Sequence, residues 1–84
     1  MTESREIRLK RLKMRSWRRG TKEMDLILGP FSDHGLSDLG ADELDLYERF
    51  LDENDQDLYQ WCSGQVAAPV SYAPLLARIR PELA

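Results

Sequence analysis

The chain has 84 residues, of which 42% are hydrophobic and 32% are charged, and its formal net charge is −3. This composition excludes a disordered chain, and the single cysteine and single histidine exclude both a disulfide framework and a Cys/His zinc cluster within one chain. We expect one domain over residues 1–84, with residues 1–6 disordered, and a core too thin to enclose a deep active site.

A first helix is predicted over residues 4–19, which contain no proline or glycine and many residues that favour helices. One side of this helix carries residues that are expected to pack: Leu9, Leu12 and Ser16. Another side carries three large apolar residues: Ile7, Met14 and Trp17. Because tryptophan side chains are usually largely buried, we interpret Trp17 as a core residue rather than as a semi-exposed anchor.

Gly20 interrupts the helical pattern, and glycine enters a left-handed backbone conformation without steric cost. It can therefore end the first helix, with Thr21 capping a second one. Arg19 and Glu23 lie four positions apart across the glycine, so we expect both to be exposed on one small surface, a hydrogen-bond donor beside an acceptor. From the spacing alone, an ordinary helix end with solvated charges is the simpler interpretation.

The second helix should follow an apolar stripe that is typical of a core-facing helix: Met24, Ile27, Leu28 and Phe31. Pro30 lacks a backbone donor and disfavours helix at the residue before it, so we expect a kink or a restart at this position. His34, which stands beside a glycine, is expected to be a solvated loop residue rather than a metal ligand.

A third helix is predicted to begin near Asp42 and Glu43, because negative charge in the first turn complements the helix dipole. Its expected buried face consists of Leu44, Tyr47, Phe50 and Leu51. The opposite face is acidic, and we interpret it as solvated; it carries Asp45, Glu48 and Asp52.

The acidic run over residues 52–57 is rich in oxygen ligands, but it lacks the central glycine and the downstream glutamate of an EF-hand, so no Ca²⁺ loop is expected. Asn54 or Asp55 is expected to cap a fourth helix. The inward side of that helix carries Leu58, Trp61 and Cys62. On such a face we interpret Cys62 as an inert packing residue rather than as a nucleophile.

The last helix is predicted to be capped by Ser71, to hold Pro74 in its first turn and to end before Pro81. Every apolar pattern along the chain has a period near 3.6 residues, and none has the period of a strand. We therefore predict an all-α fold, a compact monomeric bundle of about five short helices.

Charge is divided unevenly along the chain. Residues 1–22 hold nine basic and two acidic residues, a net charge of +7, whereas residues 23–84 hold three basic and 13 acidic residues, a net charge of −10. We expect a strong dipole that can orient an approaching partner. The alternative function is a small nucleic-acid-binding or regulatory module that uses the basic helix. Against it, the acidic remainder would repel a duplex, and no base-stacking platform is evident.

The sequence offers little for catalysis. The one histidine and the one cysteine fall in different predicted elements, and no glycine-rich phosphate loop is present. Neither a nucleophile with its base nor a metal centre is expected, so we predict that the chain is not an enzyme and that a partner supplies the chemistry.

The residues around Gly20 resemble the R-G-x-x-E signature of the SdhE family, small helical factors that promote covalent attachment of FAD to the flavoprotein subunit of succinate dehydrogenase. Here the signature reads Arg19-Gly20-Thr21-Lys22-Glu23. The resemblance extends from Leu12 to Ile79. Its further matches are Met24-Asp25, Pro30-Phe31, residues 44–51, and Asp57-Leu58 with Trp61.

This resemblance implies a chaperone-like assembly factor that binds the apo-flavoprotein of succinate dehydrogenase, and of the related fumarate reductase, in the geometry that permits FAD attachment. The partner-binding residues it implies are those of the motif: Arg19, Gly20 and Glu23. Further candidates are Arg18 and Asp25, which flank the motif, Asp57 at a further family position and, as our own addition, Trp17. FAD then belongs to the flavoprotein, so this chain holds no cofactor or metal stably.

The sequence also suggests a location. No apolar run approaches the roughly 18 residues that a membrane span requires, and the basic N-terminal segment lacks the apolar core of a secretory signal. From these two exclusions and the single cysteine we predict a cytoplasmic protein.

Overall fold

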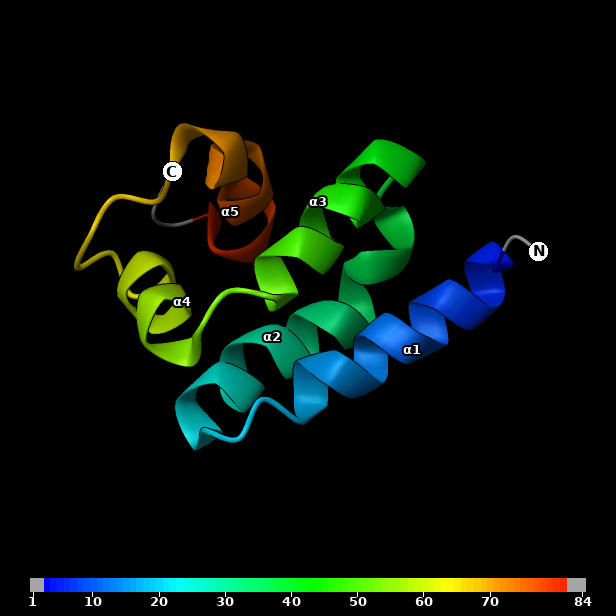
Figure 1. Ribbon diagram of the computed structural model, residues 1–84, viewed down its shortest axis with the longest axis horizontal. Coiled ribbons are helices and arrows are strands. Elements are labelled where there is room, and N and C mark those ends of the chain that lie inside the picture. Colours follow the sequence, from blue (N-terminus) through cyan, green and yellow to red (C-terminus); the bar gives the residue numbers. More distant parts are fainter. Residues whose placement is uncertain (1–2, 82–84) are drawn as a thin grey trace.

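The computed structural model describes residues 3–81 (Figure 1). Its α-helices are α1 (Arg5–Trp17), α2 (Lys22–His34), α3 (Ala41–Leu51), α4 (Asp55–Cys62) and α5 (Ala73–Ile79), and its 3-10 helices are η1 (Leu36–Asp38) and η2 (Val70–Tyr72). No strand occurs within residues 3–81, which confirms the predicted all-α fold. The expected disorder of residues 1–6 stays a prediction: residues 1 and 2 lie outside the described range, and Ser4 is the N-cap of α1.

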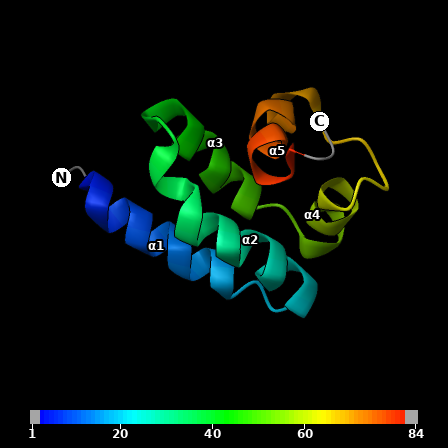
Figure 2. The same ribbon diagram turned by 180° about the vertical axis from the view of Figure 1, so that it is seen from behind.

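The helices are arranged around one hairpin. In both views α1 and α2 lie side by side, and α3 packs across the pair (Figures 1 and 2). The helices α4 and α5 gather at the end of the hairpin where α1 turns into α2, while the N-terminus lies at the opposite end. The α1–α2 turn therefore stands close to the beginning of α4, although about 35 residues separate them along the chain.

The core is built from the apolar stripes that the helical period predicts. All four residues of the expected buried face of α3 are at most 1% exposed, and Leu12, Met24, Leu28 and Leu58 are fully buried beside them. One polar pair lies within this core: the hydroxyls of Ser16 and Tyr47 are 2.5 Å apart, and burial raises the pKa of Tyr47 to about 12. Ser16 also donates to the carbonyl of Leu12, so no hydroxyl of this pair lacks a partner.

Of the predicted kink or restart at Pro30, the restart is wrong, because α2 continues without a break through this residue to His34, and the kink stays a prediction. Residues on both sides of the proline pack on the core, with Leu28 fully buried and Ser32 6% exposed. The lost hydrogen bond falls on the outer side of the helix, where Leu26 is 60% exposed and its carbonyl can be solvated. His34, expected in a loop, is the exposed last residue of this helix.

The predicted cap of the last helix is also wrong. Ser71 lies inside η2, and α5 begins after Tyr72 without a side-chain cap. Pro69 starts this 3-10 turn, so the chain is already wound when it reaches α5. Pro74 does lie in the first turn of α5, as predicted. Within residues 3–81, no helix combines the length and the apolar composition that crossing a membrane demands.

Candidate functional site

The connection between α1 and α2, residues 18–21, forms a turn, and we call this turn together with the first two residues of α2 (residues 18–23) the corner. Gly20 has a φ of +96°, the left-handed conformation that was predicted for it. A Cβ atom at this position would find no heavy atom within 4 Å, so the space beside the glycine is open. Thr21 caps α2 as predicted, since its hydroxyl accepts the N–H of Met24 at 3.4 Å. The corner thus needs glycine for its backbone and presents that glycine outward.

Arg19 does not lie exposed on the corner, and this prediction is wrong. Its side chain is 12% exposed and reaches the segment between α3 and α4. Nε donates to Asp55 Oδ1 at 2.8 Å, and the two terminal nitrogens donate to the backbone carbonyls of Leu51 and Glu53. The guanidinium joins the corner to the start of α4, because its planar fork can serve three acceptors at once.

Asp25 fixes the backbone of Arg19 as well. The amide N–H of Arg19 donates to Asp25 Oδ1 at 3.0 Å, and Asp25 is half-buried in the first turn of α2. Both the main chain and the side chain of Arg19 are therefore held by side chains or carbonyls of other elements. We call these contacts, from Asp25 and from the α3–α4 segment, the Arg19 latch.

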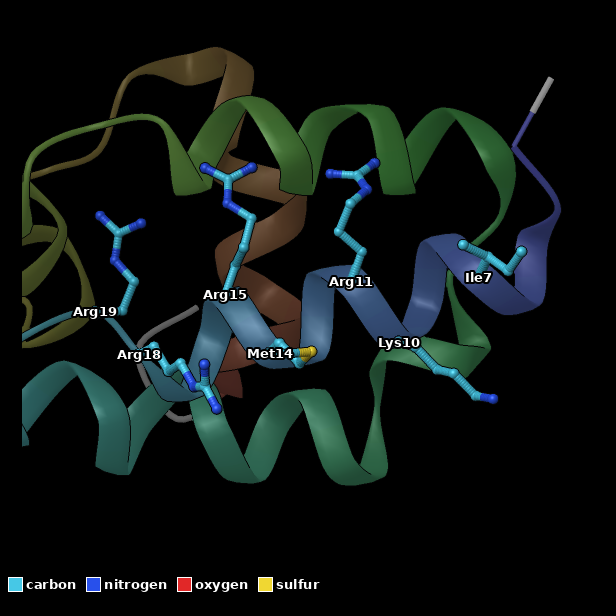
Figure 3. Close-up of a pocket in the computed structure, with 7 residues that line it drawn as sticks. All are labelled: Ile7, Lys10, Arg11, Met14, Arg15, Arg18 and Arg19. Atoms are coloured by element: carbon cyan, nitrogen blue, oxygen red, sulfur yellow. The ribbon is translucent and has the colours of Figure 1, made fainter. Parts of the chain in front are cut away.

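The exposed charges of the corner are those of Arg18, Lys22 and Glu23. Among residues 3–81 none of these side chains has an ion-pair partner, and Glu23 does not pair with Arg19 as the spacing suggested. Arg19 is not available to Glu23 because its side chain turns toward α3 and α4, whereas Arg18 leaves the chain in a different direction (Figure 3). The expected exposure of Glu23 is confirmed.

A shallow groove of about 340 Å³ runs from the corner to α4. It is lined by Thr21, Glu23, Asp55, Gln56 and Tyr59. The three α4 residues were missed as candidates, although positions 55, 56 and 59 have the i, i+1, i+4 spacing of one helical face. Tyr59 is 38% exposed, so its aromatic ring is available for contact at this groove.

Asp57 does not line this groove. Its Oδ2 accepts a hydrogen bond from the Asn54 amide at 2.9 Å, and its own N–H donates to Asn54 Oδ1 at 2.9 Å. Asn54 is thereby the N-cap of α4, as predicted. Asp57 helps to fix the helix that carries Asp55 and Tyr59.

Trp17 is not a core residue, so the favoured interpretation is wrong. It is 40% exposed, and its ring lies flat against Gly29 of α2, where an added Cβ would come within 2.6 Å of the ring. Its indole N–H donates to Asp33 Oδ1 at 3.2 Å, and Lys13 Nζ lies 3.1 Å from the same oxygen. The absence of a side chain at Gly29 lets the ring cover α2 from outside instead of entering the core.

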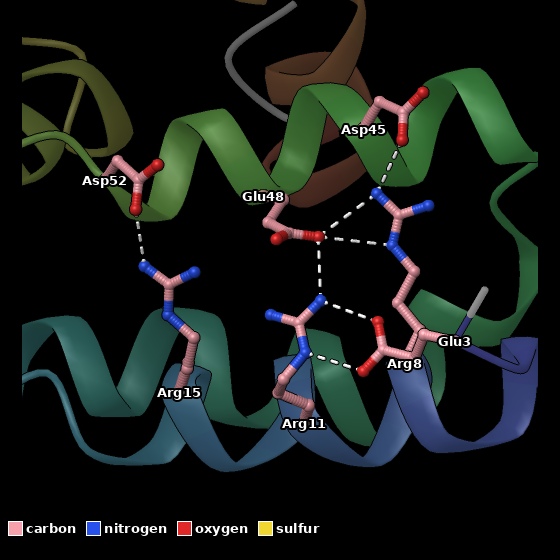
Figure 4. A network of polar contacts seen from close by, with 7 residues as sticks. All are labelled: Glu3, Arg8, Arg11, Arg15, Asp45, Glu48 and Asp52. Carbon is pink, nitrogen blue, oxygen red and sulfur yellow. Dashed lines mark hydrogen bonds and ion pairs between the residues drawn. The ribbon is translucent and has the colours of Figure 1, made fainter. Parts of the chain in front are cut away.

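The acidic face of α3 is only partly what was predicted: Asp45 and Asp52 are exposed, but Glu48 is half-buried and all three carboxylates are paired. Its carboxylates face basic residues of α1 across the helix interface (Figure 4). Arg8 contacts Asp45 at 2.6 Å and Glu48 at 3.1 Å, Arg11 contacts Glu48 at 3.1 Å, and Arg15 contacts Asp52 at 2.8 Å. These ion pairs could not be predicted from the sequence, because the residue pattern of α3 does not show which helix packs against its acidic face. The strong dipole expected from the charge division is therefore largely neutralised within the molecule.

The structure also places the cysteine and the potential metal ligands of the described residues. Burial raises the pKa of the Cys62 thiol to about 11, so this cysteine is a protonated packing residue, as predicted. Residues 3–81 contain no group of three or more potential metal ligands of the His, Cys, Asp and Glu types. What the corner can provide is recognition, through three exposed charges without an ion pair in residues 3–81 (Arg18, Lys22 and Glu23), an open glycine and the exposed ring of Tyr59 nearby.

Comparison with known proteins gives one consistent result. A family model described as "Flavinator of succinate dehydrogenase" matches residues 10–82. The protein named "Succinate dehydrogenase assembly factor 2, mitochondrial" of Mycosarcoma maydis is 39% identical over 72 residues, which cover 86% of this chain and 30% of that protein. The protein of the same name from Schizosaccharomyces pombe is 40% identical over 67 residues, 80% of this chain and 48% of that protein.

A third relative, from Aspergillus flavus, carries the same name and is 47% identical over 53 residues, 63% of this chain and 18% of that protein. The chain thus spans less than half the length of the curated relatives that it matches here. The names of these relatives contradict the predicted cytoplasmic location, since all three are called mitochondrial. The sequence argument failed because the lack of a secretory signal and of a membrane span does not distinguish the cytoplasm from a mitochondrial compartment.

Proposed function

Because the chain belongs to the family of succinate dehydrogenase flavinators, whose curated members are assembly factors of that enzyme, we propose that it binds the apo-flavoprotein subunit of succinate dehydrogenase through the corner and promotes covalent attachment of FAD. The flavoprotein of fumarate reductase is a second partner on this proposal. The observation that carries it is the presentation of Gly20: an open left-handed glycine beside the exposed charges of Arg18, Lys22 and Glu23, held in place by the Arg19 latch.

The proposed mechanism is a shift in the population of flavoprotein conformers. A protein that binds the attachment-competent conformer better than the others raises its occupancy without taking part in bond formation. A tenfold shift needs a binding preference of about 1.4 kcal/mol. One hydrogen bond to a charged group contributes about 1.5–3 kcal/mol, so a contact made by Glu23 in only one conformer would be sufficient.

FAD itself is assigned to the flavoprotein on this proposal. The groove beside the corner carries the carboxylates of Glu23 and Asp55, which disfavour the diphosphate of a dinucleotide. The chain alone holds no flavin, and its role is that of a non-catalytic chaperone.

The decisive experiment compares two glycines that share one backbone conformation. Gly20 and Gly64 both have a positive φ, +96° and +82°, and both are exposed, but Gly64 follows α4 and lies away from the corner. Gly20→Arg and Gly64→Arg therefore impose similar backbone strain and the same added side chain. Each purified variant is supplied to apo-flavoprotein with FAD and a dicarboxylate, and covalent flavin is followed by fluorescence in a denaturing gel.

We expect Gly20→Arg to lose its support of flavin attachment while Gly64→Arg retains it. Circular dichroism and denaturation of both variants serve as the folding control. If a folded Gly20→Arg protein were fully active, the corner would not be the working surface. If both variants lost activity in proportion to their stability, the effect would be one of folding.

A further inference from the structure

One face of α1 remains uncovered by the other elements within residues 3–81. It carries two exposed apolar side chains, Ile7 at 59% and Met14 at 53%. An open groove of about 560 Å³ lies over them. We call this face the α1 strip and define it by Ile7, Lys10, Arg11, Met14, Arg15 and Arg18.

The spacing of these residues follows the helix. Positions 7, 10, 11, 14, 15 and 18 recur at intervals of three and four residues, so they form one continuous face. From the first to the last position this face is about 16 Å long. The core-facing residues of the same helix, Leu12 and Ser16, are fully buried on another side. The α1 strip is thus a second apolar stripe on a helix whose first stripe already has its partner.

Positively charged side chains lie on both sides of the apolar residues of the α1 strip. In Figure 3 Arg11 and Arg15 extend toward α3, Lys10 and Arg18 extend the other way, and Met14 lies between the two rows. Arg11 and Arg15 form ion pairs with carboxylates of the chain itself. Lys10 and Arg18 are exposed and have no ion-pair partner within residues 3–81. The uncompensated positive charge therefore lies along the edge that faces away from α3.

We propose that the α1 strip binds an apolar segment of the flavoprotein that is flanked by acidic side chains, so that the contact made at the corner continues along α1. This inference rests on the proposed function. Two observations select the occupant: Arg18 belongs both to the corner and to the strip, and Lys10 with Arg18 requires carboxylates beside the apolar residues that cover Ile7 and Met14.

An anionic membrane surface is a poorer match for the same face. A flat surface that touched Met14 would also approach the outer side of α3, where the side chains of Asp45 and Asp52 are 61% and 70% exposed. Because these carboxylates already pair with Arg8 and Arg15, this side of the face offers anionic lipid no net positive charge, and two apolar residues bury little area in a bilayer. A narrow protein segment avoids the α3 carboxylates.

The first test measures the affinity of the chain for purified apo-flavoprotein. We expect Met14→Glu and Ile7→Glu each to weaken binding about tenfold, because each removes apolar contact and places a carboxylate opposite the acidic segment. Both sites are exposed and glutamate favours helix, so the variants should fold. The matched control is Val70→Glu, at an 89% exposed apolar residue of η2 outside the strip, which should bind as the unaltered chain does.

The second test identifies the chemistry of the occupant. A zero-length carbodiimide reaction joins the amine of Lys10 to a carboxylate in direct contact, and mass spectrometry then locates the joined peptides. We expect Lys10 to be coupled to an aspartate or glutamate within an apolar stretch of the flavoprotein. Lys10→Arg keeps the positive charge and cannot form the stable amide, so it should bind normally and lose the product.

The outcomes separate this inference from the proposed function. If Met14→Glu binds the flavoprotein as tightly as the unaltered chain while Gly20→Arg does not bind, the strip proposal fails and the corner stands. If the unaltered chain does not bind the flavoprotein, both fail. If vesicles of phosphatidylcholine with phosphatidylglycerol capture the chain, and Met14→Glu abolishes only that capture, the occupant is a membrane and the proposal is overturned.

Discussion

At the scale of single residues, the guanidinium of Arg19 donates to three acceptors near the corner. Replacing Arg19 with alanine leaves the carbonyls of Leu51 and Glu53 and the carboxylate of Asp55 without this donor, at a site where the two charged side chains are 12% and 25% exposed. We expect Arg19→Ala to lower the free energy of unfolding by about 2 kcal/mol. Urea denaturation measures this loss.

The neighbouring substitution Arg18→Ala is the control, because Arg18 is exposed and unpaired within residues 3–81. Its effect on the free energy of unfolding should stay within about 0.5 kcal/mol. Equal effects of the two substitutions would mean that the Arg19 latch does not form in solution. On the proposed function, the latch gives Arg19 the role of positioning the corner, while the exposed residues make the direct contact with the partner.

Glu23 should behave in the opposite way. It is exposed and has no ion-pair partner within residues 3–81. We expect Glu23→Gln to leave the free energy of unfolding within about 0.5 kcal/mol and to weaken flavoprotein binding about tenfold, since a charged hydrogen bond becomes a neutral one. Calorimetric titration and urea denaturation of the same preparation separate the two effects. Unchanged affinity would remove Glu23 from the contact.

A small substitution at Gly20 separates backbone strain at the corner from contact with a partner. A Cβ at Gly20 meets no atom within 4 Å, but the φ of +96° is unfavourable for any residue with a side chain. We expect Gly20→Ala to lower the free energy of unfolding by about 1 kcal/mol, which for a domain of this size shifts the melting temperature by about 4–8 °C. Thermal denaturation checks the value, and an unchanged melting temperature would show that the turn relaxes without strain.

At the scale of elements, the α1–α3 interface makes stability depend on pH. Hydrogen bonding from Arg11, assisted by Arg8, holds the pKa of Glu48 below its ordinary value of 4.5. A lowered pKa means that the pair stabilises the fold above about pH 4.5 and that this contribution is lost as the pH falls through the lowered value. Glu48 is 32% exposed, so its contribution at neutral pH is modest, about 0.5–1 kcal/mol.

We therefore expect Glu48→Gln to be less stable than the unaltered chain at neutral pH and equally stable in strong acid, because glutamine cannot form the charged pair. Urea denaturation between about pH 7 and pH 2.5 follows the difference. Asp38 is exposed on η1 and forms no ion pair in the described part of the chain, so Asp38→Asn is the control. If the free energies of unfolding of Glu48→Gln and the unaltered chain still differed in acid, the cause would be packing and not the charged pair.

The elements also show which parts of the structure a sequence can reveal. The buried face of α3 was predictable because burial repeats with the helical period inside one element, and Leu44 and Phe50 obey it. The positive φ of Gly20 was predictable for a similar reason, since only local backbone sterics decide it. The orientation of Arg19 was not, because its acceptors lie 32–36 residues further along the chain. Trp17 was misassigned because its position depends on the missing side chain of Gly29.

At the scale of the whole molecule, the uneven charge of the sequence becomes a set of short-range pairs. The molecule is 39 Å long, several times the Debye length of about 8 Å at physiological salt. Arg8, Arg11 and Arg15 each lie within about 3 Å of a carboxylate of α3, so their fields cancel over that distance. Long-range orientation of a partner by this molecule should therefore be weak, and recognition must come from contact.

The pairing of the α1 cations also predicts that the alternative function, nucleic-acid binding, is weak. A duplex laid along α1 would meet Lys10 and Arg18 as unpaired cations, but it would lie beside the exposed carboxylates of Asp45 and Asp52. With about two phosphates neutralised, affinity is low and falls with only the second power of the salt concentration. We expect no binding tighter than about 10⁻⁴ M at physiological salt.

Fluorescence anisotropy of a labelled duplex measures this affinity directly, with Lys10→Glu as the matched variant. Micromolar binding that Lys10→Glu abolished would show that the α1 strip serves phosphates, and the acidic flavoprotein segment proposed for that strip would then have to be replaced.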